Sequence, residues 1–116
     1  MAYVPVRGDI IHLNFDPATG KEMKGAHFAL VISAKAFNAR GLAMVCPISQ
    51  GHAADARTHG TVVSLMGAGT DTQGMVHCHQ LKGLDWRERR AQFKERVDDF
   101  ISDEVAGRLD AILFGD

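Results

Sequence analysis

The stretch that decides the fold is Arg7-Gly8-Asp9-Ile10-Ile11-His12-Leu13-Asn14-Phe15-Asp16-Pro17. Its apolar residues alternate, which is typical of a β-strand with one face on a core. We expect the core face to carry Ile11, Leu13 and Phe15, and the other face Ile10, His12 and Asn14. The Asp-Pro turn ends this strand, and a polar loop continues to Gly25. The loop carries Lys21 and Glu22, which places charge at the rim of a sheet, where a cleft can form.

The composition predicts one ordinary globular domain that spans residues 1–116. Apolar residues make up 46 % and charged residues 23 % of the chain, which separates it from disordered and fibrous proteins. No apolar run approaches the roughly 18 residues of a membrane span, and the first residues lack a secretory signal. We therefore expect a cytoplasmic protein with no membrane association. Cys46 and Cys78 lie among apolar residues, so we expect reduced, buried thiols.

Charge is segregated along the chain although the net charge is only −1. Basic residues dominate the stretch from Lys82 to Arg96, and acidic residues dominate from Val97 onward. A basic stretch can contact phosphate groups. It can equally be a solvated face with internal ion pairs. The sequence leaves both interpretations open.

Short apolar segments predict a series of strands, which we place at residues 28–32, 42–46, 61–65 and 74–80. Pro47 is expected to end the second of these, Ser33 to cap a short helical turn, and residues 50–60 to form an exposed loop. Residues 86–97 are expected to form a turn and then a strand. A terminal helix capped by Ser102 follows, with Val105, Leu109, Ile112 and Leu113 at helical spacing. The fold class is therefore mostly β with short helices, as a small antiparallel barrel or half-open sheet.

Two histidines, His77 and His79, stand one residue apart in a predicted strand, so we expect both rings on one face. An imidazole titrates near neutral pH, so the pair can act as a general base and a general acid. Phosphodiester cleavage by an RNA 2′-OH needs both. Two alternatives stay open. The histidines can be edge residues without a function, or they can form half of a zinc site, for which no second pair of ligands at a fitting spacing is evident.

Several motifs resemble the MazF/PemK (Kid) family of bacterial toxin endoribonucleases. They are Gly8-Asp9-Ile10, Phe15-Asp16-Pro17, the Gly20-Lys21-Glu22 loop with its following apolar strand, Ala36-Phe37-Asn38, and Val76-His77-Cys78-His79-Gln80. The resemblance implies a CcdB/MazF-type, SH3-like barrel with a C-terminal helix, assembled as a homodimer. It implies cofactor-free and metal-independent cleavage of single-stranded RNA to a 2′,3′-cyclic phosphate and a 5′-hydroxyl. It also implies a cognate antitoxin whose disordered acidic tail covers the RNA groove.

The chain departs from the family pattern at the positions that the resemblance marks as catalytic. His77 stands where relatives carry Arg, His79 where they carry Asp, and His27 where Gly-x-Arg-Pro has its Arg. Ser49 stands where they carry Thr. The catalytic candidates are therefore His27, Ser49, His77 and His79.

The candidates for RNA binding are Lys21, Glu22, Lys82 and Arg87, with Glu22 orienting the substrate and Lys82 and Arg87 holding flanking phosphates. His12 and Asn14 are expected to border the same cleft, and His52 and His59 to contact solvent or RNA.

Two other functions remain in view. The His replacements favour a toxin-like barrel that has lost turnover and only binds an antitoxin or RNA. Gyrase poisoning, as in the CcdB branch of the fold, is less favoured because the Phe15-Asp16-Pro17 and Val76–Gln80 motifs follow the endoribonuclease branch.

Overall fold

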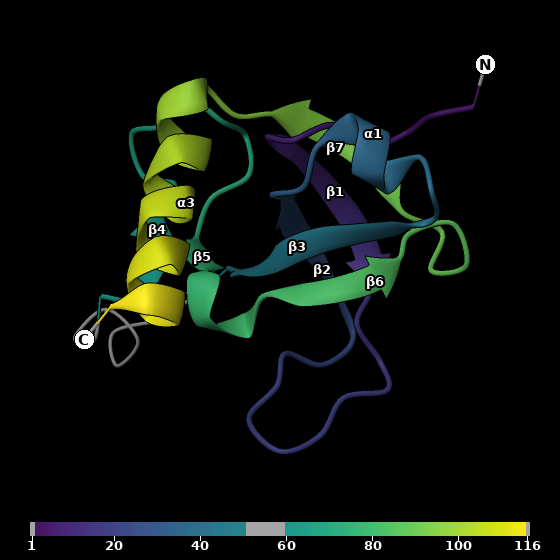
Figure 1. Cartoon of the computed structure of the whole chain (residues 1–116), viewed down its shortest axis with the longest axis horizontal. Coiled ribbons are helices and arrows are strands. Elements are labelled where there is room, and N and C mark those ends of the chain that lie inside the picture. Colours follow the sequence, from purple (N-terminus) through teal and green to yellow (C-terminus); the bar gives the residue numbers. More distant parts are fainter. Residues whose placement is uncertain (1, 51–59, 116) are drawn as a thin grey trace.

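The computed structural model describes residues 2–50 and 60–115. Its elements are β1 (Asp9–Asn14), β2 (Ala26–Val31), α1 (Lys35–Asn38), β3 (Leu42–Ser49), β4 (Val62–Ser64), β5 (Met75–His77), the 3₁₀ helix η1 (Cys78–Gln80), β6 (Lys82–Asp85), β7 (Gln92–Arg96) and α3 (Asp99–Phe114). The strands form one sheet in the order β4-β5-β3-β2-β1-β7, and β6 pairs with β3 beside that path. All pairings are antiparallel. Figure 1 shows the sheet curving beside α3, as expected for a half-open barrel.

Strand β3 is the central element and is longer than the sequence suggests. Its first half pairs with β6, from Leu42 to Val45, and its last two residues, Ile48 and Ser49, pair with β5. The expectation that Pro47 ends this strand is wrong. Pro47 pairs with Ala29 of β2 on one side and lies between the β6 and β5 segments on the other. A proline lacks an N–H, so it is tolerated where no neighbouring strand needs one.

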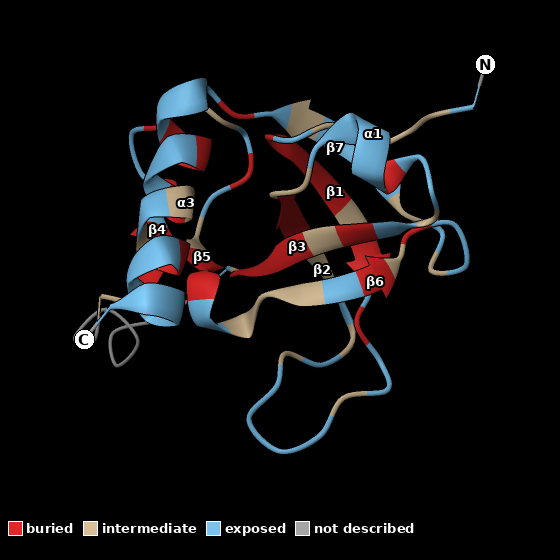
Figure 2. Cartoon of the chain, in the orientation of Figure 1, coloured by how far each residue is buried: buried red, intermediate tan, exposed pale blue. Residues whose placement is uncertain are grey.

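The sheet has two buried faces, which corrects the expected pattern of β1. Ile10 was expected on the outer face, but it belongs to a core cluster between the sheet and α3, with Leu30 and Val105. Ile11 and Leu13 belong to a second cluster on the opposite face, which Trp86 covers. In Figure 2 the buried colour therefore runs through the central strands, while the β1–β2 loop is exposed.

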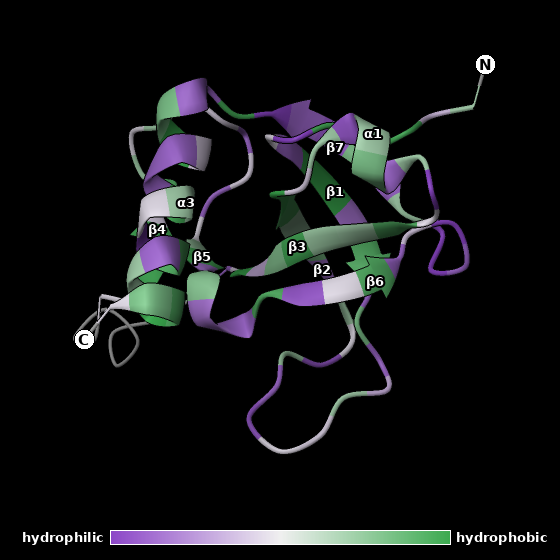
Figure 3. Ribbon diagram, in the orientation of Figure 1, coloured by the Kyte–Doolittle hydropathy of each residue, from purple (hydrophilic) through white to green (hydrophobic). Residues whose placement is uncertain are grey.

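Helix α3 begins earlier than expected. Asp98 occupies the N-cap position, so Ser102 does not cap the helix but lies buried within it. Val105 and Leu109 face the sheet as predicted, whereas Ile112 and Leu113 are exposed. Figure 3 shows the C-terminal turn of α3 as a hydrophobic segment on the outside of the molecule.

The short helix α1 also differs from expectation, because Ser33 does not cap it. Ala34 is the N-cap residue and makes no side-chain cap. The Ser33 hydroxyl instead donates to the side chain of Asn38 and accepts from the backbone N–H of Met44. Trp86 donates its indole N–H to the Asn38 carbonyl. These polar contacts fix α1 against β3 and β6.

The region after β4 holds two further corrections. The strand expected at residues 74–80 ends at His77, and η1 takes its place at Cys78–Gln80. A strand that the sequence did not predict, β6, follows. The expected turn and strand within residues 86–97 are confirmed by β7. Most of the loop expected at residues 50–60, namely residues 51–59, lies outside the described residues.

Cys46 and Cys78 are free, buried thiols, as expected, although Cys78 lies in η1 rather than in a strand. Burial raises the pKa of both thiols, that of Cys78 to about 11. Within the described residues, no helix combines the length and hydropathy needed for a membrane crossing.

The packing predicts that truncation of two leucines lowers the free energy of unfolding by different amounts. Leu30 is fully buried between β1 and β3, whereas Leu42 is exposed at the start of β3. We expect Leu30→Ala to lower the free energy of unfolding by about 2–5 kcal/mol, because it leaves a cavity. Leu42→Ala is the matched control and should cost less than about 1 kcal/mol. Urea denaturation measures both, and equal losses would contradict the assigned core.

Candidate functional site

The site is built where β3 and β5 end side by side. Ser49 of β3 pairs with Met75 of β5. His77 lies two residues after Met75 on β5, and its imidazole contacts the Ser49 side chain. The distance from Ser49 Oγ to His77 Nε2 is 2.7 Å. Gly74 makes this approach possible. Its φ is +124°, and a Cβ atom at this position would lie 2.0 Å from the Ser49 carbonyl oxygen, so a side chain here would displace the end of β3.

His77 is unusual because it is buried, with 8 % of its surface exposed, and incompletely hydrogen-bonded. Its Nδ1 atom is buried and has no hydrogen-bond partner among the described residues. The neutral ring carries one proton, so either tautomer leaves Nδ1 unsatisfied, as a donor or as an acceptor. An unsatisfied buried group of this kind costs about 1–3 kcal/mol, and such groups call for an explanation.

Burial also sets the protonation of His77. The pKa of His77 is lowered from its ordinary 6.5, first by burial and then by the neighbouring charges of His79 and His27. A depressed pKa keeps the ring neutral at neutral pH. The Ser49 hydroxyl can then donate to an unprotonated Nε2, which is the form that accepts a proton.

His79 lies close to His77, but not for the expected reason. Strand alternation cannot align the two rings, because β5 ends at His77 and His79 lies in η1. The tight turn nevertheless brings the ring centroids to 5.5 Å. His79 is exposed while His77 is buried, so the two imidazoles occupy different environments.

His27 joins the same region from β2. Its Nε2 lies 2.6 Å from the Lys24 carbonyl oxygen, and since a carbonyl only accepts, Nε2 carries a proton. The ring also packs at 6.4 Å from the ring of Phe15. The charge of His27 contributes to the lowered pKa of His77. The structure thus groups all four catalytic candidates, His27, Ser49, His77 and His79.

The β1–β2 loop is attached to this region by two contacts. Glu22 forms an ion pair with Lys82 at 3.1 Å, and the Met23 N–H donates to the Gln80 side-chain oxygen at 2.7 Å. A cavity of about 360 Å³ lies beside the contacts, lined by Thr19, Lys21, Glu22, His79 and Gln80. The loop candidates Lys21 and Glu22 therefore lie next to His79.

Gln80 is a site residue that the sequence reasoning missed. It is part of the Val76–Gln80 motif, but its contact with Met23 joins positions 57 residues apart in the chain. The only sequence signal was its place in that motif.

Other candidates lie apart from this group. Arg87 is in the turn after β6, at the opposite end of that strand from Lys82, and stacks on the Trp86 ring at 4.3 Å. His12 packs edge-on against Phe28, with 5.0 Å between ring centroids. His52 and His59 lie outside the described residues. In the described part of the chain, no three His, Cys, Asp or Glu side chains form a group suited to a metal ion.

Part of the basic stretch is committed to internal contacts. Lys82 pairs with Glu22, and Arg96 pairs with Asp9. Arg89 donates to the backbone carbonyls of residues 14 and 16. Two of the six basic side chains are therefore ion-paired and a third is hydrogen-bonded to the backbone, whereas Arg87, Arg90 and Lys94 are exposed.

Comparison with known proteins gives a consistent result. Residues 6–113 match the family described as PemK-like, MazF-like toxin of type II toxin–antitoxin system. Endoribonuclease PemK of Escherichia coli is 40 % identical over 108 residues, covering 92 % of this chain and 80 % of that protein. The crystal structure of MazF from Deinococcus radiodurans has a TM-score of 0.87 and 34 % identity, covering 97 % of this chain and 98 % of that one.

A MazE–MazF complex from the same organism gives a TM-score of 0.81 at 34 % identity, with 97 % of each chain covered. The sheet of seven strands with its C-terminal helix therefore matches MazF structures, which confirms the expected fold class.

The environment of His77 predicts its titration. In the folded chain we expect the midpoint of the His77 ring below 6.5, and His79→Gln should raise it without restoring the ordinary value, because burial remains. Between the lowered pKa and 6.5 the unfolded chain binds more protons, so the free energy of unfolding should fall as the pH drops through this window. NMR titration of the ring protons measures the midpoint. His12→Gln is the control, and a midpoint at or above 6.5 would contradict the assignment.

Proposed function

Because the chain belongs to the family of PemK-like, MazF-like toxins of type II toxin–antitoxin systems, we propose that it is a metal-independent endoribonuclease. Its substrate is single-stranded mRNA, which it cleaves selectively at particular sequences by attack of a ribose 2′-OH. The observation that carries this proposal is the contact between Ser49 and a buried, neutral His77. The names of its relatives, among them endoribonuclease PemK, support the same activity.

His77 is the general base in this mechanism. Its Nδ1 is buried, so a substrate proton can only reach Nε2, the ring nitrogen that lies against the Ser49 hydroxyl. Nε2 takes the proton of the ribose 2′-OH, and the 2′ oxygen attacks the adjacent phosphorus. For this step the Ser49 hydroxyl leaves Nε2 and donates to a phosphate oxygen instead, so that the lone pair of Nε2 is free for the proton of the 2′-OH.

His79 is the general acid. It is exposed and adjacent to His77, so it can protonate the departing 5′ oxygen as the phosphorus–oxygen bond breaks. The products are a 2′,3′-cyclic phosphate and a 5′-hydroxyl. His27, when protonated, stabilises the negative charge on the pentacovalent phosphate. Two imidazoles supply both proton transfers, so the chemistry requires no metal.

RNA contacts come from the β1–β2 loop and from β6. Lys21 and Glu22 line the cavity beside His79, where Glu22 orients the nucleotide. Lys82 leaves its ion pair with Glu22 to hold a flanking phosphate. Arg87, at the far end of β6, contacts the RNA farther along its backbone.

The proposal extends to assembly and partners. The chain acts as a single toxin domain over residues 1–116, forms a homodimer in the cytoplasm, and is inhibited by a cognate antitoxin whose disordered acidic tail covers the RNA site. The MazE–MazF complex of Deinococcus radiodurans supports an antitoxin partner.

A second candidate function is binding without turnover. It is favoured by the histidines at positions 27, 77 and 79, where the family pattern has Arg or Asp. Purified protein that binds RNA but does not cut it in the presence of EDTA, and whose expression alone does not stop growth, would establish this alternative.

Substitution of the two histidines tests the enzyme. We expect His77→Gln and His79→Gln each to slow cleavage of a mixed RNA pool by about a hundredfold to ten-thousandfold, the usual contribution of one general acid or base. His12→Gln, which changes a histidine outside the cluster, should leave the rate unchanged. Gel analysis with EDTA present gives the rates. Wild-type rates for both His77→Gln and His79→Gln would remove the pair from the mechanism.

A further inference from the structure

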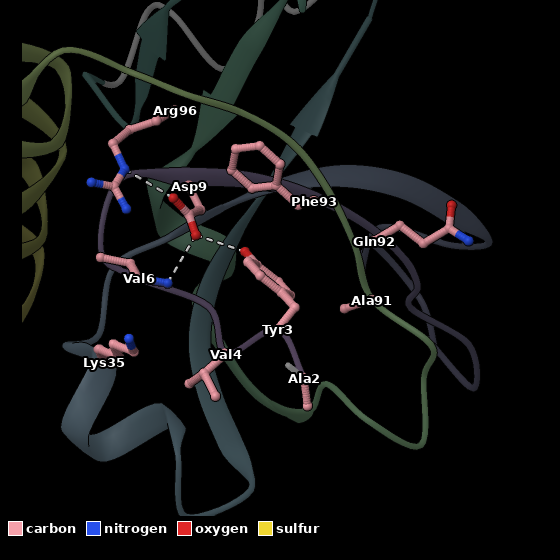
Figure 4. A pocket seen from close by; sticks show the side chains of 10 residues that line it. All are labelled: Ala2, Tyr3, Val4, Val6, Asp9, Lys35, Ala91, Gln92, Phe93 and Arg96. Carbon is pink, nitrogen blue, oxygen red and sulfur yellow. Dashed lines mark hydrogen bonds and ion pairs between the residues drawn. The ribbon is translucent and has the colours of Figure 1, made fainter.

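A second cavity lies away from the histidines, between the N-terminal segment and β7. Its volume is about 630 Å³, and Tyr3, Val4, Asp9, Lys35, Phe93 and Arg96 are among the residues around it (Figure 4). None of its lining residues belongs to the cavity beside His79. We call it the Arg96 pocket.

The polar floor of the Arg96 pocket is a buried carboxylate, Asp9, which is 1 % exposed. Asp9 accepts hydrogen bonds from the Tyr3 hydroxyl at 2.6 Å and from the Val6 N–H at 2.9 Å. It also pairs with Arg96 Nε at 3.0 Å. Burial and the Asp9 hydrogen bond raise the pKa of Tyr3, so its phenol remains a donor. Two hydrogen-bond donors and one cation therefore offset the charge of Asp9.

Asp9 holds Arg96 through one nitrogen, Nε. Within the described residues the other two guanidinium nitrogens, which Figure 4 draws at the end of the side chain, form no hydrogen bond. The side chain remains 55 % exposed. The pair of terminal nitrogens forms the planar edge that binds a carboxylate through two parallel hydrogen bonds. Asp9 thus fixes a guanidinium whose free edge is suited to a second carboxylate.

Apolar groups surround this cation. The rings of Tyr3 and Phe93 lie 5.7 Å apart in a tilted arrangement, and Phe93 is half-exposed. Val4 and Ala91 extend the apolar surface, and Lys35 adds a second cation. Aromatic walls favour a flat apolar body through ring contacts. The volume lies within the usual range of small-molecule sites, about 300–1,000 Å³.

We propose that the Arg96 pocket binds a small carboxylic acid with an aromatic body. The carboxylate pairs with the free edge of Arg96, and the aromatic body packs against the Tyr3–Phe93 ring pair. This site is separate from the proposed RNA site and does not depend on ribonuclease activity.

Three small molecules test separately, on the whole chain, whether the carboxylate and the aromatic ring of the ligand contribute to binding. Phenylacetate carries both the charge and the ring, phenylacetamide lacks the charge, and acetate lacks the ring. In NMR titrations we expect phenylacetate to shift the backbone amides of Tyr3, Val4 and Phe93, and to bind at least about tenfold more tightly than either control. Equal affinity for phenylacetamide or for acetate would overturn the proposal, as would shifts confined to other parts of the chain.

Variants locate the ligand. Arg96→Lys retains a cation opposite Asp9 but lacks the planar fork, so phenylacetate affinity should fall about tenfold. Phe93→Ala removes a half-exposed ring and should weaken binding without unfolding the chain, which keeps the test valid if Arg96→Lys is unstable. Lys94→Ala is the matched control, because Lys94 lies on the same strand and does not line the pocket. Unchanged affinity in Phe93→Ala, or in a folded Arg96→Lys, would refute the site.

Discussion

The hydrogen bond between Ser49 and His77 is the contact on which the proposed active site depends. It exists because the last residues of β3 pair with β5, so that two strand ends finish at the same place. The close approach at Gly74 permits that pairing. The position of His77 is therefore fixed by main-chain hydrogen bonds of the central sheet, whereas the loop residues around it are held by side-chain contacts.

Burial of His77 at this position costs free energy, which a histidine with a purely structural role would not need to spend. The Nδ1 atom of His77 is buried and has no partner in the part of the chain that the structure describes, and the pKa of the ring is depressed by burial and by two other histidines. The resemblance in sequence implies an arginine at this position, and compared with that permanent cation the imidazole of His77 is a group that is neutral at neutral pH. Activity of this site would consequently depend on pH in a range where an arginine does not titrate.

Much of the fold was predictable from local patterns, since apolar runs located the central strands and helical spacing located Val105 and Leu109. The errors have common physical causes. Local patterns mislead at Pro47 and Ile10, because distant segments determine the second neighbour of a strand and the second buried face of a sheet. Ser33 and Ser102 resemble helix caps in the sequence, but a hydroxyl near a helix start can bond to other groups, and its partners depend on the tertiary fold.

The candidate site was predictable in its membership but not in its geometry. His77 and His79 do come together, but through a turn rather than through strand alternation. Gln80 and the ion pair between Glu22 and Lys82 depend on contacts between segments far apart in the chain, which no local pattern encodes.

The most direct test of the proposed mechanism is the pH dependence of RNA cleavage under single-turnover conditions, from about pH 5 to 8. If His77 is the base, the rate should fall on the acid side with a midpoint below that of an ordinary histidine, and this acid limb should vanish in His77→Gln. An acid limb that persists unchanged in His77→Gln would contradict the role assigned to this residue.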